Sequence, residues 1–236
     1  MDKIKLIRTI SLWVFIVPFV SINVCLIIVT QFHEFLEMGV SLGPFFPYLD
    51  GGASISRTVR NYPLSLIFKP AMFLTSYLLI RYWYLNKNLI IELNQDHKYL
   101  KKIIFFGISS AIALSIHTIF LGIKFEYDLY KLFRRVILLA FIIFEIIAQA
   151  YLVIIFYSIK DKLNQYINPK ILKLKLILVS TLCVVAIISI PIISVPGDYF
   201  LGMNLKFFKH ALEWDYFIGV ISFYLLTFFM WKKVRP

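Results

Sequence analysis

Ionisable side chains inside apolar segments are the residues of this chain that could do chemistry. Glu145 lies near the middle of an apolar run, and Gln149 follows one helical turn later on the same face. His117 and Lys69 lie in two other apolar runs. Charged side chains are costly inside a membrane, so they usually face neighbouring helices or a cavity. We therefore expect Glu145 to face a bundle interior, paired with Lys69 or His117 as a structural clamp, or to belong to a site that handles lipid or protons.

A second group of polar residues lies in the connections between apolar runs. One connection, 31–62, is rich in glycine and proline, and we expect it to fold back over one mouth of the bundle. It serves there either as an inert cap or as a lid whose arginines meet an anionic lipid headgroup. The candidates from this group, as headgroup contacts or internal polar clamps, are Asp50, Arg57, Arg60, His210 and Glu213.

Metal and covalent chemistry have no support in the spacing of these residues. A hydrolytic metal site would need a pattern such as His-x-x-x-His, and a serine hydrolase would need Gly-x-Ser-x-Gly. Neither pattern occurs in the sequence. Cys25 and Cys183 each lie inside an apolar run, which disfavours a disulfide framework or a zinc site. We expect no metal and no cofactor, and the lack of a catalytic motif favours a protein that is not an enzyme.

The elements that must position these residues are membrane-spanning helices. Apolar residues make up 60% of the chain and charged residues 16%, against about 25% charged residues in soluble domains. A spanning helix needs about 20 apolar residues. The runs of that length lie near 9–30, 63–84, 103–123, 136–159, 175–196 and 214–231. The sequence therefore predicts an all-α, six-helix transmembrane bundle that forms one domain over residues 1–236, with an ordered first extracytoplasmic loop.

The distribution of basic residues predicts the orientation of this bundle. The termini and the alternate connections on their side carry fifteen Lys and Arg residues, whereas the other connections carry eight. Because cytoplasmic connections carry the excess of basic residues, both termini are expected in the cytoplasm. The connection at 124–135, with four basic residues, is the exception. The net charge of +12 lies in short clusters that flank apolar runs, which argues against a nucleic-acid partner.

Small residues recur every four positions on one face of the third run, at Gly107, Ala111 and Ser115. Such a face permits close approach of two helices in a membrane. We expect an internal contact of the bundle here, with a homo-oligomer or a protein partner as the alternative.

Four short stretches resemble the DRAM-type family: PFFPYLDGGA at 44–53, RNYP at 60–63, HALEW at 210–214 and WKK at 231–233. This family groups the fibroblast-growth-factor-receptor-activating protein, the damage-regulated autophagy modulators and the yeast Sfk proteins. It includes the Golgi factor for lipid remodelling of GPI anchors and the N-terminal part of the Cwh-type ceramide-remodelling protein. The resemblance implies six spans with cytoplasmic ends and a role in lipid remodelling.

These observations favour a multi-pass membrane protein that binds membrane lipid, or helps to remodel it, at the outer or lumenal leaflet. The lipid would be GPI-anchor-like or a phospholipid, and the membrane would be the plasma membrane or, in a eukaryote, the Golgi or the ER. One alternative is a small-solute or proton-coupled transporter that uses Glu145, Gln149 and Lys69 near the midplane. Another is a non-catalytic scaffold that recruits partners through its basic inner connections.

Overall fold

A computed structural model describes residues 2–32, 46–93, 97–123, 127–194, 199–200 and 203–232. Its helices are α1 (Asp2–Gln31), α2 (Pro47–Asp50), α3 (Ile55–Val59), α4 (Leu64–Leu93), α5 (Leu100–Phe120), α6 (Asp128–Ser158), α7 (Lys160–Leu163), α8 (Pro169–Ser194) and α9 (Leu205–Met230). Two short antiparallel strands, β1 (Tyr199–Phe200) and β2 (Met203–Asn204), precede α9. The first half of the predicted outer loop, 33–45, lies outside the described residues, and the rest of it forms α2, α3 and their flanks.

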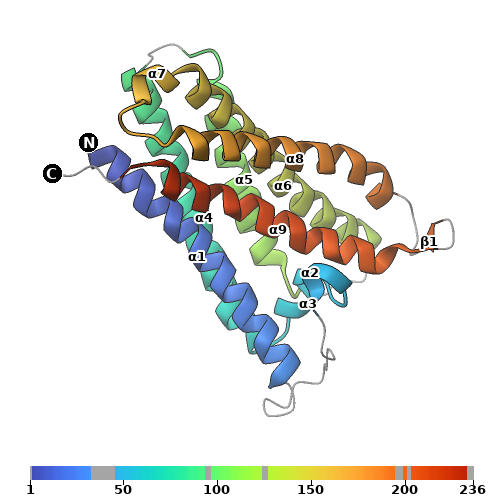
Figure 1. Cartoon of the computed structure of the whole chain (residues 1–236). Helices are drawn as coiled ribbons and strands as arrows, with labels where there is room; N and C mark the ends of the chain where they lie inside the picture. The colour runs from blue at the N-terminus through green and yellow to red at the C-terminus, as the bar shows by residue number, and fades with distance from the viewer. Residues whose placement is uncertain are drawn as a thin grey trace.

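Six helices of the described residues are long and apolar enough to cross a membrane, namely α1, α4, α5, α6, α8 and α9. The predicted all-α bundle with six long apolar helices is confirmed. Both ends of the described chain lie at the same end of the bundle (Figure 1), as an even number of crossings requires.

α6 begins at Asp128, about two turns before the predicted start of the fourth span near residue 136. With 31 residues, α6 is roughly 46 Å long, whereas the hydrocarbon core of a bilayer is about 30 Å thick. The helix can therefore continue into the interfacial region, where basic residues are tolerated. Arg134 and Arg135 were assigned to the 124–135 connection, but they lie on this helix.

α1 and α9 diverge toward one end of the bundle (Figure 1). α1 and α9 lie close together near the termini, where Nε of Arg8 donates to the carbonyl oxygen of Phe228 at 3.2 Å. They diverge toward the opposite end, and α2 and α3 lie between them there (Figure 1). The short segment thus occupies the wide end of the bundle.

The small-residue face of α5 packs inside the bundle. A Cβ atom at Gly107 would come within 2.5 Å of the Trp83 ring on α4, so only glycine allows this approach. Ala111 is also buried, whereas Ser115 is half-buried. This is the internal contact that the spacing predicts.

Candidate functional site

The segment at 46–59 is anchored to one face of α9. Nδ1 of His210 donates to the carbonyl oxygen of Gly51 at 2.9 Å, and Nε1 of Trp214 donates to that of Ala53 at 2.8 Å. Between these two bonds, the carboxylate of Glu213 accepts hydrogen bonds from the backbone amides that begin α3. Positions 210, 213 and 214 share one helical face. The stretches at 44–53 and 210–214 therefore meet in space wherever both are described.

Gly51 makes the closest approach of this segment to α9. It ends α2 with a φ of 62°, a left-handed conformation that glycine adopts without strain. A Cβ atom on Gly51 would lie 1.8 Å from the carbonyl oxygen of Phe207. A residue with a Cβ atom would be strained in this conformation, and that atom would overlap the Phe207 backbone.

Tyr48 extends the anchoring to α1. Its ring packs edge-on against Trp214 with a centroid separation of 4.8 Å. Its hydroxyl donates to Oδ1 of Asn23 on α1 at 3.2 Å. Burial raises the pKa of the Tyr48 phenol above its ordinary value, so the group keeps its proton at neutral pH. The segment consequently links α1 to α9 at the end where they diverge.

The other polar residues predicted on this segment lie away from its buried side. Asp50 closes the α2 turn, with Oδ2 accepting from the amide of Phe46 at 2.7 Å and Oδ1 from that of Gly52 at 2.8 Å. Arg57 and Arg60 are exposed. Their predicted contact with a lipid headgroup stays a prediction.

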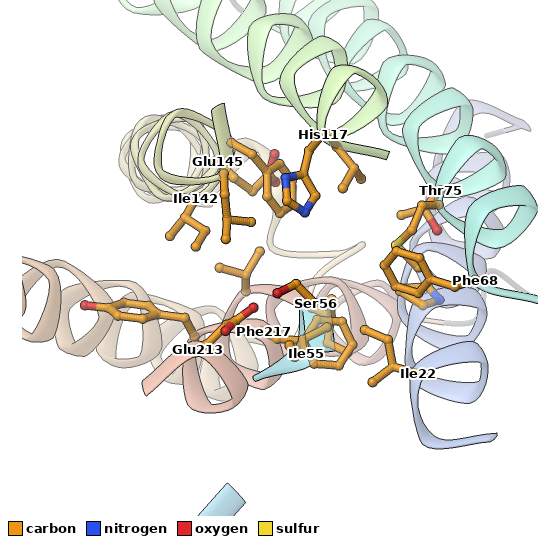
Figure 2. Close-up of a pocket in the computed structure, with 18 of the residues that line it drawn as sticks. Ile22, Ile55, Ser56, Phe68, Thr75, His117, Ile142, Glu145, Glu213 and Phe217 are labelled. Carbon is orange, nitrogen blue, oxygen red and sulfur yellow. The ribbon is translucent and has the colours of Figure 1, made fainter. Parts of the chain in front are cut away.

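A cavity lies beneath this segment, between α1, α3, α4, α5, α6 and α9. Together with its opening it encloses about 810 Å³ of empty space, of which about 80 Å³ can hold the centre of a water-sized molecule. Its walls are almost entirely apolar side chains. Three predicted site residues from three helices meet in it: His117, Glu145 and Glu213. Figure 2 shows His117 and Glu145 on one side of the cavity, with Glu213 and Ser56 on the other.

Glu145 is fully buried and joins three helices. Its carboxylate accepts hydrogen bonds from the hydroxyl of Ser110 on α5 and from that of Tyr224 on α9. Gln149, one turn away on α6, donates to it at 3.2 Å and also to the carbonyl oxygen of Val220 at 3.1 Å. The partners are thus hydroxyl and amide groups rather than Lys69 or His117. This arrangement favours the structural clamp over a carrier site.

Two buried side-chain nitrogen atoms on α5 and α6 lack hydrogen-bond partners within the described part of the chain. Nδ1 of His117 and Nε of Arg134 are buried, and no group in the described part of the chain bonds to either atom. Arg134 lies on α6 one turn before Leu138, which lines the cavity. The Arg134 guanidinium lies 5.9 Å from the centre of the Tyr130 ring, and Arg134 itself does not line the cavity. The sequence assigned Arg134 to a connection, so its position on α6 was not foreseen.

Lys69 and Gln149 do not line the cavity. Lys69 is half-buried on α4 beside the lining residue Phe68, and Gln149 lies one turn beyond Glu145.

Lys175, the first residue of the predicted fifth span, is a buried cation. It is 0% exposed on α8, its Nζ donates to Oγ1 of Thr227 at 2.7 Å, and it lies 3.8 Å from the centre of the Phe223 ring. No carboxylate among the residues described here pairs with it. The hydropathy profile locates a lysine along a span but does not reveal which helix face it occupies.

The long apolar helices, the anchored segment and the internal cavity define a multi-pass α-helical membrane protein. Comparison with family models, with curated proteins and with solved structures finds no match. The resemblance to the DRAM-type family is therefore still a prediction.

Proposed function

We propose that this protein binds membrane lipid by taking an acyl chain into the cavity beneath the 46–59 segment. The supporting observation is an apolar cavity inside a transmembrane bundle that contains only a few polar groups. Binding sites for small molecules have this composition, with apolar walls and a small number of polar groups that fix the orientation of the ligand.

The dimensions of the cavity favour a chain over a bulky group. Only about 80 Å³ of its space admits the centre of a water-sized molecule, so the cavity is narrow throughout. A hydrocarbon chain is thin and flexible enough to fill such a space, whereas a sugar-bearing or phosphate-bearing headgroup is not. The headgroup of a bound lipid would accordingly stay at the opening.

The predicted orientation places this end of the bundle at the outer or lumenal leaflet, because both termini lie at the other end. Holding an acyl chain there is a step that remodelling of a GPI-anchor-like lipid or a phospholipid requires. The resemblance to the DRAM-type family extends the proposal from binding to such remodelling.

Filling the cavity should abolish binding. Leu138 lines the cavity, whereas its neighbour Leu139 does not and is 38% exposed. We expect Leu138→Trp to reduce photolabelling by a diazirine-bearing palmitic acid about tenfold in phosphatidylcholine nanodiscs, because the indole occupies the space of the chain. Mass spectrometry should locate the wild-type label on cavity-lining residues of α6 and α9.

Leu139→Trp is the matched control, because it adds the same indole to the lipid-facing side of the same helix. It should label like the wild type. Labelling spread over the lipid-facing surface, and equal in all three proteins, would refute the proposal.

A further inference from the structure

An open groove on the outside of α5 and α6 is another hollow of the bundle, and none of its residues lines the cavity. It has room for the centres of water-sized molecules over about 390 Å³. Two lysines and three aromatic residues form its walls: Lys101, Lys102, Phe105, Phe106 and Tyr151. α5 begins after two crossings, so its first turn lies at the end of the bundle that holds both termini. The predicted orientation places this end at the cytoplasmic side.

The groove is basic at its cytoplasmic end and apolar toward the membrane. Phe105 lies one helical turn beyond Lys101, and Phe106 lies one turn beyond Lys102. The apolar surface continues along this face of α5, where Phe105 is 62% exposed and Ile112, two turns later, is 49% exposed. A phospholipid in the cytoplasmic leaflet has the same polarity, because its headgroup lies at the interface and its acyl chains lie in the hydrocarbon core.

Tyr99 and Tyr151 position the amino group of Lys102. Its Nζ lies 5.6 Å from the centre of the Tyr99 ring and 5.4 Å from that of the Tyr151 ring. The two rings pack against each other with a centroid separation of 5.0 Å, so they form one aromatic wall. This wall attracts the ammonium group and restricts the lysine side chain, which reduces the entropy that the side chain loses when it binds an anion.

The charges of the two lysines are not neutralised within the described part of the chain. Both side chains are exposed. No carboxylate among the described residues forms an ion pair with either of them. Ammonium groups donate to a phosphate through charge-assisted hydrogen bonds, and one phosphate can accept from two of them. The groove is therefore complementary to a ligand that joins a phosphate to apolar chains.

We propose that this groove binds an anionic phospholipid of the cytoplasmic leaflet. The phosphate accepts hydrogen bonds from Lys101 and Lys102, and an acyl chain lies along Phe105 and Phe106. Basic pockets beside transmembrane helices at the cytoplasmic side recognise anionic headgroups in this way. The groove is a second lipid site at the opposite end of the bundle, and the proposal does not depend on acyl-chain binding in the cavity.

Photolabelling with two lipids tests the inference. Phosphatidylglycerol and phosphatidylcholine probes, each with the same diazirine-bearing acyl chain, would be added separately at one low mole fraction to phosphatidylcholine nanodiscs. The phosphatidylglycerol probe should label residues 100–112 about tenfold more strongly than the phosphatidylcholine probe, because only the anionic headgroup is attracted to both lysines. Mass spectrometry of the labelled peptides measures the ratio.

The double substitution Lys101→Gln and Lys102→Gln should reduce labelling by phosphatidylglycerol to the level of phosphatidylcholine. The matched control is Lys170→Gln with Lys173→Gln, which removes the same charge from exposed positions at the start of α8, at the same end of the bundle. It should label like the wild type. Labelling of the cavity by the photoreactive palmitic acid should be unchanged in both double variants, so a failure of this inference is distinguishable from a failure of the proposed function.

Equal labelling of residues 100–112 by the two probes would overturn the inference. An equal loss in both double variants would also overturn it, because the preference would then reflect the total charge at this end of the bundle. Glycerol 3-phosphate has the phosphate without the acyl chains and should not compete in excess. Displacement of the probe by this compound would assign the groove to a soluble phosphate instead.

Discussion

Replacing Glu145 with alanine should lower the free energy of unfolding by about 2–4 kcal/mol. The substitution leaves the hydroxyls of Ser110 and Tyr224 and the amide of Gln149 without their shared acceptor inside the bundle. Interhelical hydrogen bonds are individually modest in membranes, but three donors lose one partner here and a cavity opens beside them. Unfolding of the purified protein in mixed micelles, followed by circular dichroism as dodecyl sulfate is increased, measures the loss.

Glu145→Gln is the control that separates hydrogen bonding from charge. Its amide oxygen can still accept from Ser110 and Tyr224, so the loss should be less than half that of the alanine variant. Binding of the photoreactive fatty acid should survive in Glu145→Gln, because the clamp role needs an acceptor rather than a titrating acid. A glutamine variant that is fully stable but no longer binds the photoreactive fatty acid would contradict the clamp role and favour proton handling.

Gly51→Ala should release the 46–59 segment from α9. Alanine at this position must adopt a left-handed conformation that costs about 1–2 kcal/mol. Its Cβ atom would also overlap the carbonyl oxygen of Phe207, a backbone atom that cannot move aside cheaply. We expect hydrogen exchange of the amides at 46–59 to accelerate at least tenfold, and labelling in the cavity to fall, because the segment forms part of the cavity wall.

The neighbouring Gly52→Ala is the matched control. Gly52 is not among the glycines with positive φ in the described chain, and its amide bond to Asp50 does not depend on the side chain. Exchange at 46–59 should match the wild type. A Gly51→Ala protein whose segment stays as protected as that of Gly52→Ala would show that the docking on α9 is looser than the structure indicates.

The spans could be predicted from the sequence because a bilayer imposes a minimum apolar length on each helix. His117, Glu145 and Glu213 could be named as candidates from the sequence, because each is ionisable and lies in or beside an apolar run. Their partners could not be predicted in this way. Ser110 and Tyr224 meet Glu145 only because three helices present the right faces to one another.

The position of Arg134 is a second feature that the sequence did not predict. A basic residue near the end of an apolar run is expected in a connection, since hydropathy penalises it within a span. A helix longer than the membrane is thick can carry such a residue, and only the packing of α6 shows that its Nε is buried. α1, α4, α8 and α9 likewise extend beyond the predicted apolar runs, so hydropathy located the spans but not the helix ends.

The position of α9 in the chain has a consequence for biogenesis. α9 supplies Tyr224 to Glu145, Thr227 to Lys175, and the face that holds the 46–59 segment. The ribosome makes α9 after every other helix described here, so the buried acid on α6 and the buried lysine on α8 are inserted before Tyr224 and Thr227 exist. Until α9 is made, the insertion machinery or water must supply the hydrogen-bond partners that α9 later provides. A nascent chain that stops before residue 205 should be degraded rather than accumulate as a partial bundle.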